Sequence, residues 1–180
     1  MNARTPVITA TVSAAFLIFL AAHEGYSPTV VTTAADPVPT GGFGSTKNEL
    51  GKPLKVGEAM PPVRALVVLR AHVSRDEAAF KASLPGVTLT QGEYDLYMDF
   101  VYQYGIGRWN NSDMRAELLA GDYRAACNAL LKYRYSNGRD CSDPVAGGWG
   151  KSWGCKGVWT RQQERHQKCI AEVEAAGGRS

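Results

Sequence analysis

The stretch HEGYSPTVVTTAADPVPTGGFGST, residues 23–46, decides the fold that we expect for this chain. It starts with His23, Glu24 and Gly25 directly after an uncharged apolar run, and near its end is the glycine-rich motif TGGFG at residues 40–44. Prolines and a patch of β-branched residues at 29–33 lie between the two ends. Such a composition is typical of short strands joined by turns. We therefore expect a helix that ends near Glu24, followed by a small β-hairpin.

The chain after this hairpin is dominated by helical patterns. Apolar residues recur at helical spacing from Pro61 to about Leu84. Thr90 and Glu93 form a capping box that opens a second helix, which we expect to stop at Gly105. Further helices are expected over residues 114–120, 123–131 and 160–175, with a loop over 136–157. A small hairpin region followed by a helical lobe predicts an α+β fold that is mostly helical.

The composition favours one globular domain and excludes a nucleic-acid partner. Of 180 residues, 44% are apolar and 21% are charged, as in ordinary globular domains. The formal net charge is only +3, and the lysines and arginines are scattered singly. Charge this dilute does not follow a phosphate backbone. We expect a monomer without a cofactor.

Four cysteines lie in the last third of the chain, at positions Cys127, Cys141, Cys155 and Cys169. None is in the C-x-x-C spacing of a zinc or redox site, so we expect no metal. An even number of cysteines in a protein outside the cytosol indicates two disulfides. The spacing leaves all three pairings open.

The segment PVITATVSAAFLIFLAA, residues 6–22, has no charge and follows Arg4, which predicts a membrane-directed helix with its N-terminus in the cytoplasm. Its reach is about 25 Å, short of the roughly 30 Å hydrocarbon core of a bilayer, so the span is marginal. A cleaved signal peptide is the alternative, but cutting after Ala22 puts Leu20 where a small residue is required. We therefore expect an uncleaved anchor helix over 1–22, a catalytic domain over 23–175 and a disordered tail over 176–180.

Glu24 is the candidate acid. A carboxyl at the end of an apolar helix, facing a glycine-rich hairpin, is expected to be partly desolvated, which would raise its pKa and keep it protonated near neutrality. A glycosidase requires such a group to protonate its leaving oxygen.

Further motifs follow in order: DFVYQYG at 99–105, LLAGDY at 118–123, GRDC at 138–141 and CKGVWTR at 155–161. Together with Glu24-Gly25 and TGGFG, they resemble the phage lysozymes of glycoside hydrolase family 24. The resemblance covers most of residues 23–170 and implies a lysozyme-like fold. The N-terminal segment resembles the signal-arrest-release anchors found on some of these endolysins.

This resemblance implies that Glu24 protonates the bond between N-acetylmuramic acid and N-acetylglucosamine in peptidoglycan, while Thr40 helps to place the attacking water. The family has eight residues between its Glu and Asp and five between its Asp and Thr. Here Glu24 and Asp36 are separated by eleven, and Asp36 and Thr40 by three. Asp36 is nevertheless the only acid in the loop and is our candidate for the second carboxylate. Otherwise it only shapes the turn before Pro37, and Thr33 or Thr40 positions the water.

Three more residues are candidates for substrate binding: Tyr102, Tyr104 and Arg161. They lie in or next to the family's motifs, although aromatic residues at helical spacing are more often core. The expected partners are peptidoglycan glycan strands and, through residues 6–22, the host inner membrane. The catalytic domain would lie in the periplasm, where release from the membrane would switch it on.

Two rival functions remain open at this point. A lytic transglycosylase cuts the same bond with one acid. This function stays possible because Asp36 departs from the spacing that the family has for its second carboxylate. A non-catalytic, membrane-tethered wall-binding protein would use the hairpin and helices only to hold sugars.

Overall fold

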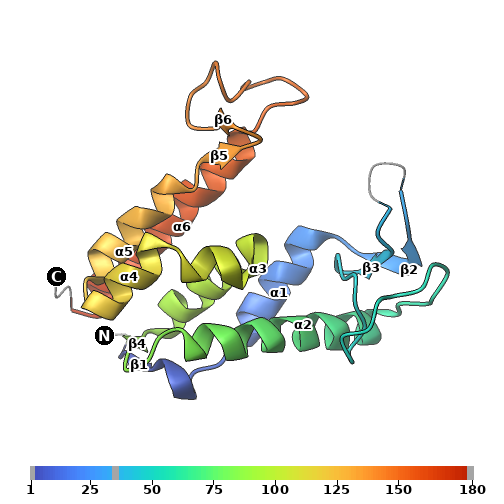
Figure 1. Cartoon of the computed structure of the whole chain (residues 1–180), viewed down its shortest axis with the longest axis horizontal. Coiled ribbons are helices and arrows are strands. Elements are labelled where there is room, and N and C mark those ends of the chain that lie inside the picture. Colours follow the sequence, from blue (N-terminus) through green and yellow to red (C-terminus); the bar gives the residue numbers. More distant parts are fainter. Residues whose placement is uncertain (1–2, 34–36, 178–180) are drawn as a thin grey trace.

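The computed structural model describes residues 3–33 and 37–177 of the chain. Six α-helices, two short 3-10 helices and six short strands are present in these residues (Figure 1). In chain order they are β1 (Thr5–Pro6), η1 (Val7–Thr9), α1 (Ala14–Glu24), β2 (Ser27–Val31), β3 (Thr40–Gly42), α2 (Pro62–Ala82), β4 (Thr88–Leu89), α3 (Gln91–Asn110), α4 (Asp113–Ala120), α5 (Tyr123–Ala129), η2 (Leu130–Lys132), β5 (Tyr135–Ser136), β6 (Arg139–Asp140) and α6 (Lys156–Ala175).

The helices form the body of the molecule and the strands form three separate two-stranded sheets, each antiparallel. Figure 1 shows the β2–β3 hairpin at one end of the long helix α2, with α4, α5 and α6 gathered toward the other end and α1 and α3 between them. The expected α+β fold with a dominant helical part is confirmed. The expected hairpin after Glu24 is also confirmed, as β2 paired with β3.

The N-terminal segment differs from our expectation, because a continuous helix over residues 6–22 is not formed. Thr5 and Pro6 instead pair with β4, and the amide of Val7 donates to the Val87 carbonyl at 3.0 Å. Helix α1 begins only at Ala14, where the hydroxyl of Ser13 accepts a hydrogen bond from the Phe16 amide. Over residues 3–33 and 37–177, we find no helix that combines the length and the apolarity needed to cross a membrane.

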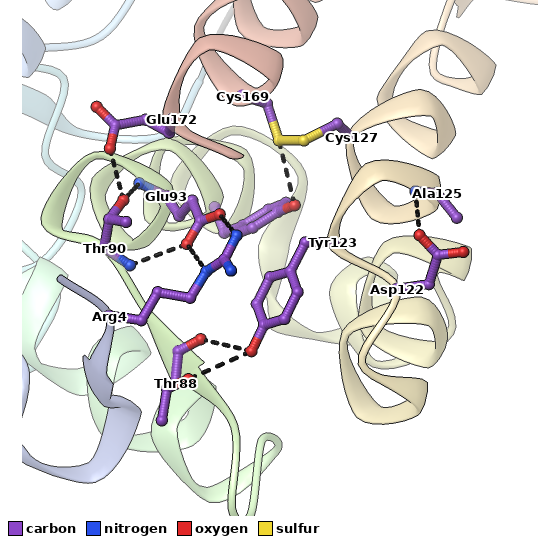
Figure 2. A network of polar contacts seen from close by, with 11 residues as sticks. Arg4, Thr88, Thr90, Glu93, Asp122, Tyr123, Ala125, Cys127, Cys169 and Glu172 are labelled. Atoms are coloured by element: carbon purple, nitrogen blue, oxygen red, sulfur yellow. Dashed lines mark hydrogen bonds and ion pairs between the residues drawn. A yellow bond between two sulfur atoms is a disulfide. The ribbon is translucent and has the colours of Figure 1, made fainter. Parts of the chain in front are cut away.

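Arg4 fixes the start of this segment to the helical body (Figure 2). Its guanidinium lies 2.7 Å from the carboxylate of Glu93, which is almost fully buried, and 3.6 Å from the centre of the Tyr123 ring. Glu93 also forms the predicted capping box with Thr90 at the start of α3. The hydrogen bonds that Arg4 donates to Glu93 raise the pKa of Arg4 above its ordinary value, although burial opposes this. One carboxylate therefore holds both the chain start and a helix start.

Two more carboxylates hold the turn that leads into α1. Glu77 of α2 accepts from the buried amide of Val12 at 2.8 Å. Asp95 of α3 accepts from both the amide and the hydroxyl of Ser13, at 3.0 and 2.6 Å. Residues 4–13 are thus an ordered part of the fold in this state.

The main apolar core includes residues from all six α-helices, and Phe16 and Leu20 of α1 are buried in it. Two disulfides brace the helical part. Cys127–Cys169 joins α5 to α6, and Cys141–Cys155 closes the loop that precedes α6. The expectation of two disulfides is confirmed, and the structure selects one of the three pairings.

Of the expected tail over residues 176–180, the last three residues lie outside the described part of the chain.

Candidate active site

Glu24 is the last residue of α1, and its carboxyl lies against the glycine-rich hairpin. Gly25, with φ 71°, ends the helix and turns the chain toward β2. A Cβ added at Gly44 would lie 3.0 Å from Oε2 of Glu24, which is tighter than ordinary carbon–oxygen packing. Gly44 also has φ +71°, in the left-handed region. The motif TGGFG therefore needs glycine at this position both for its backbone and for room beside the acid.

We expected Glu24 to be partly desolvated, whereas the structure leaves the residue exposed. Helix α1 ends at this point, so no further turn covers the carboxyl. The two preceding residues, Ala22 and His23, are exposed as well. The geometry that we expected, an acid facing the hairpin, is present without the expected burial.

Tyr102 of α3 is brought close to this acid. Burial raises the pKa of Tyr102 to about 12, and the negative charges of Glu24 and Asp76 add to this effect. Its ring lies 5.4 Å from that of His72 on α2, centre to centre. Tyr102 thus links the surroundings of Glu24 to the α2 side chains His72 and Asp76.

Thr40 is the first residue of β3 and pairs with Val31 of β2. Its hydroxyl donates to the Val38 carbonyl at 3.0 Å, so its proton is engaged and its lone pairs remain to accept from a donor. Gly44, beside the Glu24 carboxyl, lies in the turn directly after β3. Asp36 lies outside the described residues.

Tyr104 and Arg161 both contribute to the contact between α3 and α6. The hydroxyl of Tyr104 accepts from the Gln162 amide at 2.7 Å, and its ring packs 4.6 Å from that of Phe100. Arg161 donates to Asp99 at 2.7 Å and lines a groove of about 370 Å³ between α1, α3 and α6. In this structure both side chains join helices, and Arg161 alone also faces an open groove.

Sequence reasoning missed the buried charge cluster beside this groove. Asp99, only 6% exposed, accepts from both Arg161 and Arg165. Burial lowers the pKa of Arg165, and the neighbouring carboxylate of Asp99 partly offsets this. The i,i+4 spacing of the two arginines on α6, together with Asp99 in the motif DFVYQYG, was the available signal.

No group of three or more His, Cys, Asp or Glu side chains that could hold a metal ion occurs within residues 3–33 and 37–177.

A helix that ends in a glutamate, a short hairpin with glycine against that carboxyl, and a helical lobe beside them define a lysozyme-like fold. Solved structures show the same fold. The endolysin from Escherichia coli O157:H7 phage FAHEc1 superposes with a TM-score of 0.70 at 22% identity, over 90% of this chain and 94% of that one. A mutant of P22 lysozyme superposes with a TM-score of 0.68 at 20% identity, over 90% and 99% of the two chains.

Sequence comparison places the chain in a family. Residues 21–169 match the phage lysozyme family, and the chain belongs to it. It is also 26% identical to an endolysin of Acyrthosiphon pisum secondary endosymbiont phage 1. The 106 aligned residues cover 59% of this chain and 68% of the relative. The protein is thus a glycoside hydrolase of the lysozyme type, and its substrate is peptidoglycan.

Proposed function

We propose that this phage lysozyme is an endolysin that lyses the host cell by hydrolysing the β-1,4 bond between N-acetylmuramic acid and N-acetylglucosamine, with Glu24 as the proton donor. The observation that carries this proposal is the contact between the Glu24 carboxyl and Gly44 of the TGGFG motif. Glycine at position 44 leaves the space beside this carboxyl free of a side chain.

In the proposed reaction, the proton of Glu24 moves to the glycosidic oxygen as the bond from that oxygen to the anomeric carbon breaks. A water attacks the anomeric carbon and gives its own proton to a base. We assign this role to Asp36, because it is the only acid between Glu24 and Thr40 in the sequence. Thr40, whose hydroxyl keeps its lone pairs free, would accept from the water and orient it. Tyr102, close to Glu24, is the proposed sugar contact on the α3 side.

Analysis of the cleavage products tests the reaction type. Digestion of purified sacculi by the full chain should release muramic acid with a free reducing end. Ends carrying a 1,6-anhydro ring would instead identify a lytic transglycosylase. Retained binding to sacculi without any cleavage would identify a wall-binding protein.

Gly44→Ala should impair the reaction, because a Cβ here approaches Oε2 of Glu24 to 3.0 Å. We expect kcat on sacculi to fall about tenfold or more, since catalysis is sensitive to small displacements of the reacting group. Gly57→Ala is the matched control: Gly57 has φ +85° but no atom within 4 Å of its added Cβ. It should cost similar stability, about 1 kcal/mol, with kcat unchanged. Equal activities of the two variants would contradict the proposed catalytic role of Glu24 next to Gly44.

We also propose that residues 6–22 hold the new protein at the host inner membrane, with the N-terminus in the cytoplasm, before release to the periplasm. In that state residues 1–22 would act as an anchor and residues 23–175 as the catalytic domain. The proposal rests on the uncharged sequence of this segment. The structure described above then corresponds to the released enzyme, in which residues 4–13 pack on the helical body.

Thr9→Leu combined with Thr11→Leu should delay release and therefore lysis. Both threonines are exposed in the folded protein, so the change increases apolar character with little cost to the fold. Ser13 is kept, because it caps α1. The double variant should stay in the membrane fraction, whereas the double change to Asn should shift protein to the soluble fraction. Lysis at the parent's rate, with an unchanged distribution, would refute membrane control.

A further inference from the structure

Residues 141–155, here called the disulfide loop, extend from the N-terminal end of α6 away from the helical body (Figure 1). The Cys141–Cys155 bond closes the loop, and the β5–β6 hairpin leads into it. Neither the catalytic proposal nor the main core uses this loop.

The disulfide loop contains no helix or strand but is closed by a disulfide and braced by internal hydrogen bonds. The indole of Trp149 donates to the Cys141 carbonyl at 3.0 Å, and the amide of Cys155 donates to the Gly147 carbonyl at 2.9 Å. A closed loop with such internal bonds presents its side chains in a fixed arrangement, which lowers the entropy cost of binding.

Trp153 is the large apolar side chain that this arrangement exposes. It is 52% exposed. Part of its six-membered ring lies directly on Gly148, where an added Cβ would come within 2.2 Å of the ring. Gly148 has φ +58°, so glycine is favoured at this position by backbone and packing alike. The loop therefore seats an indole that remains open to solvent.

Cations surround the two indoles of the loop. The guanidinium of Arg139 lies 4.9 Å from the Trp153 ring, and the ammonium of Lys156 lies 4.8 Å from the Trp149 ring. Of the acids nearby, Asp140 pairs with Arg134, whereas Asp143 accepts from two backbone amides of the loop and keeps its negative charge. The surface at Trp153 thus combines an apolar ring with the positive charge of Arg139.

We propose that the disulfide loop is a second peptidoglycan-binding site, separate from Glu24, in which a sugar ring packs on Trp153 and the cations bind carboxylates of the stem peptides. This inference rests on the proposed function, because it takes the wall polymer as the partner. An indole presents a broad apolar face together with an N–H donor, which suits the mixed apolar and hydroxylated surface of a sugar. One exposed indole among polar residues is suited to binding a glycan. Binding to a bilayer usually requires a wider apolar face.

The site lies at the start of α6, the helix that also carries Arg161 on the groove between α1, α3 and α6. A strand held by the disulfide loop would keep the enzyme on the wall between successive cuts. Its contribution is therefore to retention on insoluble murein.

The test measures binding of the full chain to purified sacculi by co-sedimentation, in the Glu24→Gln background so that the polymer stays intact. Trp153→Ala should weaken binding about tenfold, in the range expected for an aromatic residue that dominates an interface. Trp153→Phe, which keeps an aromatic face, should restore most of it. Leu119→Ser is the matched control, because Leu119 is also an exposed apolar side chain (42%) but lies on α4, outside the loop, and it should leave binding unchanged.

Equal binding by the parent and Trp153→Ala, at equal thermal stability, would overturn this inference. So would Trp153-dependent binding to phosphatidylglycerol vesicles without a Trp153 effect on sacculi, because the partner would then be a membrane. The binding assay needs no turnover, so it separates this inference from the proposed function. The latter fails if the parent chain releases no reducing ends from sacculi.

Discussion

Glu24→Gln should lower the rate of wall hydrolysis by a factor between about 10² and 10⁴, the range supplied by a positioned general acid. The amide keeps the size of the side chain beside Gly44 but has no proton of suitable acidity to give to the leaving oxygen. Because Glu24 is exposed, the melting temperature should stay close to that of the parent. Clearing of permeabilised cells and release of reducing ends from sacculi both measure the effect.

Glu49→Gln is the matched control for this variant. Glu49 is exposed in the segment between the hairpin and α2 and lies 3.8 Å from Arg64, far from any proposed role in the reaction. The Glu49→Gln variant should hydrolyse sacculi at the parent's rate.

Asp36→Asn should cause a partial loss of activity if Asp36 activates the water. A Glu24→Gln chain that digests murein as fast as the parent would remove the basis of the catalytic proposal.

Asp99→Asn should destabilise the fold by about 3–5 kcal/mol, the cost of leaving a buried charge without its partner. Arg165 is only 4% exposed, and Asp99 is the acid that it contacts between α3 and α6. For a chain of this length, such a loss lowers Tm by about 10 °C or more. Thermal unfolding followed by circular dichroism would measure it, with both disulfides kept oxidised.

Two comparisons make the Asp99 result specific. Asp113→Asn removes an acid that pairs with Lys132 on the exposed surface, and such pairs contribute little; its Tm should hardly change. The double change Asp99→Leu with Arg165→Met should recover much of the lost stability, because apolar side chains of similar volume avoid the cost of burying both charges. A full loss in the Asp113 variant, or none in the Asp99 variant, would contradict the role given to this cluster.

Local signals predicted much of the fold. The capping box of Thr90 and Glu93 starts α3 as expected, and the glycine-rich motif after Glu24 forms the expected hairpin. Gly105 was expected to end α3, and its φ of 80° does interrupt the helix. The helix resumes to Asn110 because Trp109 is fully buried, with its indole donating to Ser83 at 2.8 Å. That contact joins residues far apart in sequence, which a local pattern does not contain.

The N-terminal error has the same origin. By hydropathy, residues 6–22 are one apolar run. The break before α1 instead depends on the hydrogen bond from Ser13 to Asp95, which lies 82 positions later in the sequence. The site shows a similar division. The sequence pattern located Glu24 and the hairpin facing it, but the exposure of Glu24 depends on where α1 ends relative to its neighbours. The pairing of the cysteines and the burial of Asp99 between two arginines also required the packing of α3, α5 and α6.

The first twenty residues carry a double demand that follows from the packing of α1. Phe16 and Leu20 are part of the apolar core of the folded enzyme. In the proposed membrane-bound stage, the same side chains must also be compatible with lipid. A substitution in this segment can therefore be tolerated in the bilayer and still destabilise the folded enzyme, or the reverse. Shortening the chain to residue 23 for production would remove this part of the interior, so a truncated enzyme should be recovered poorly folded.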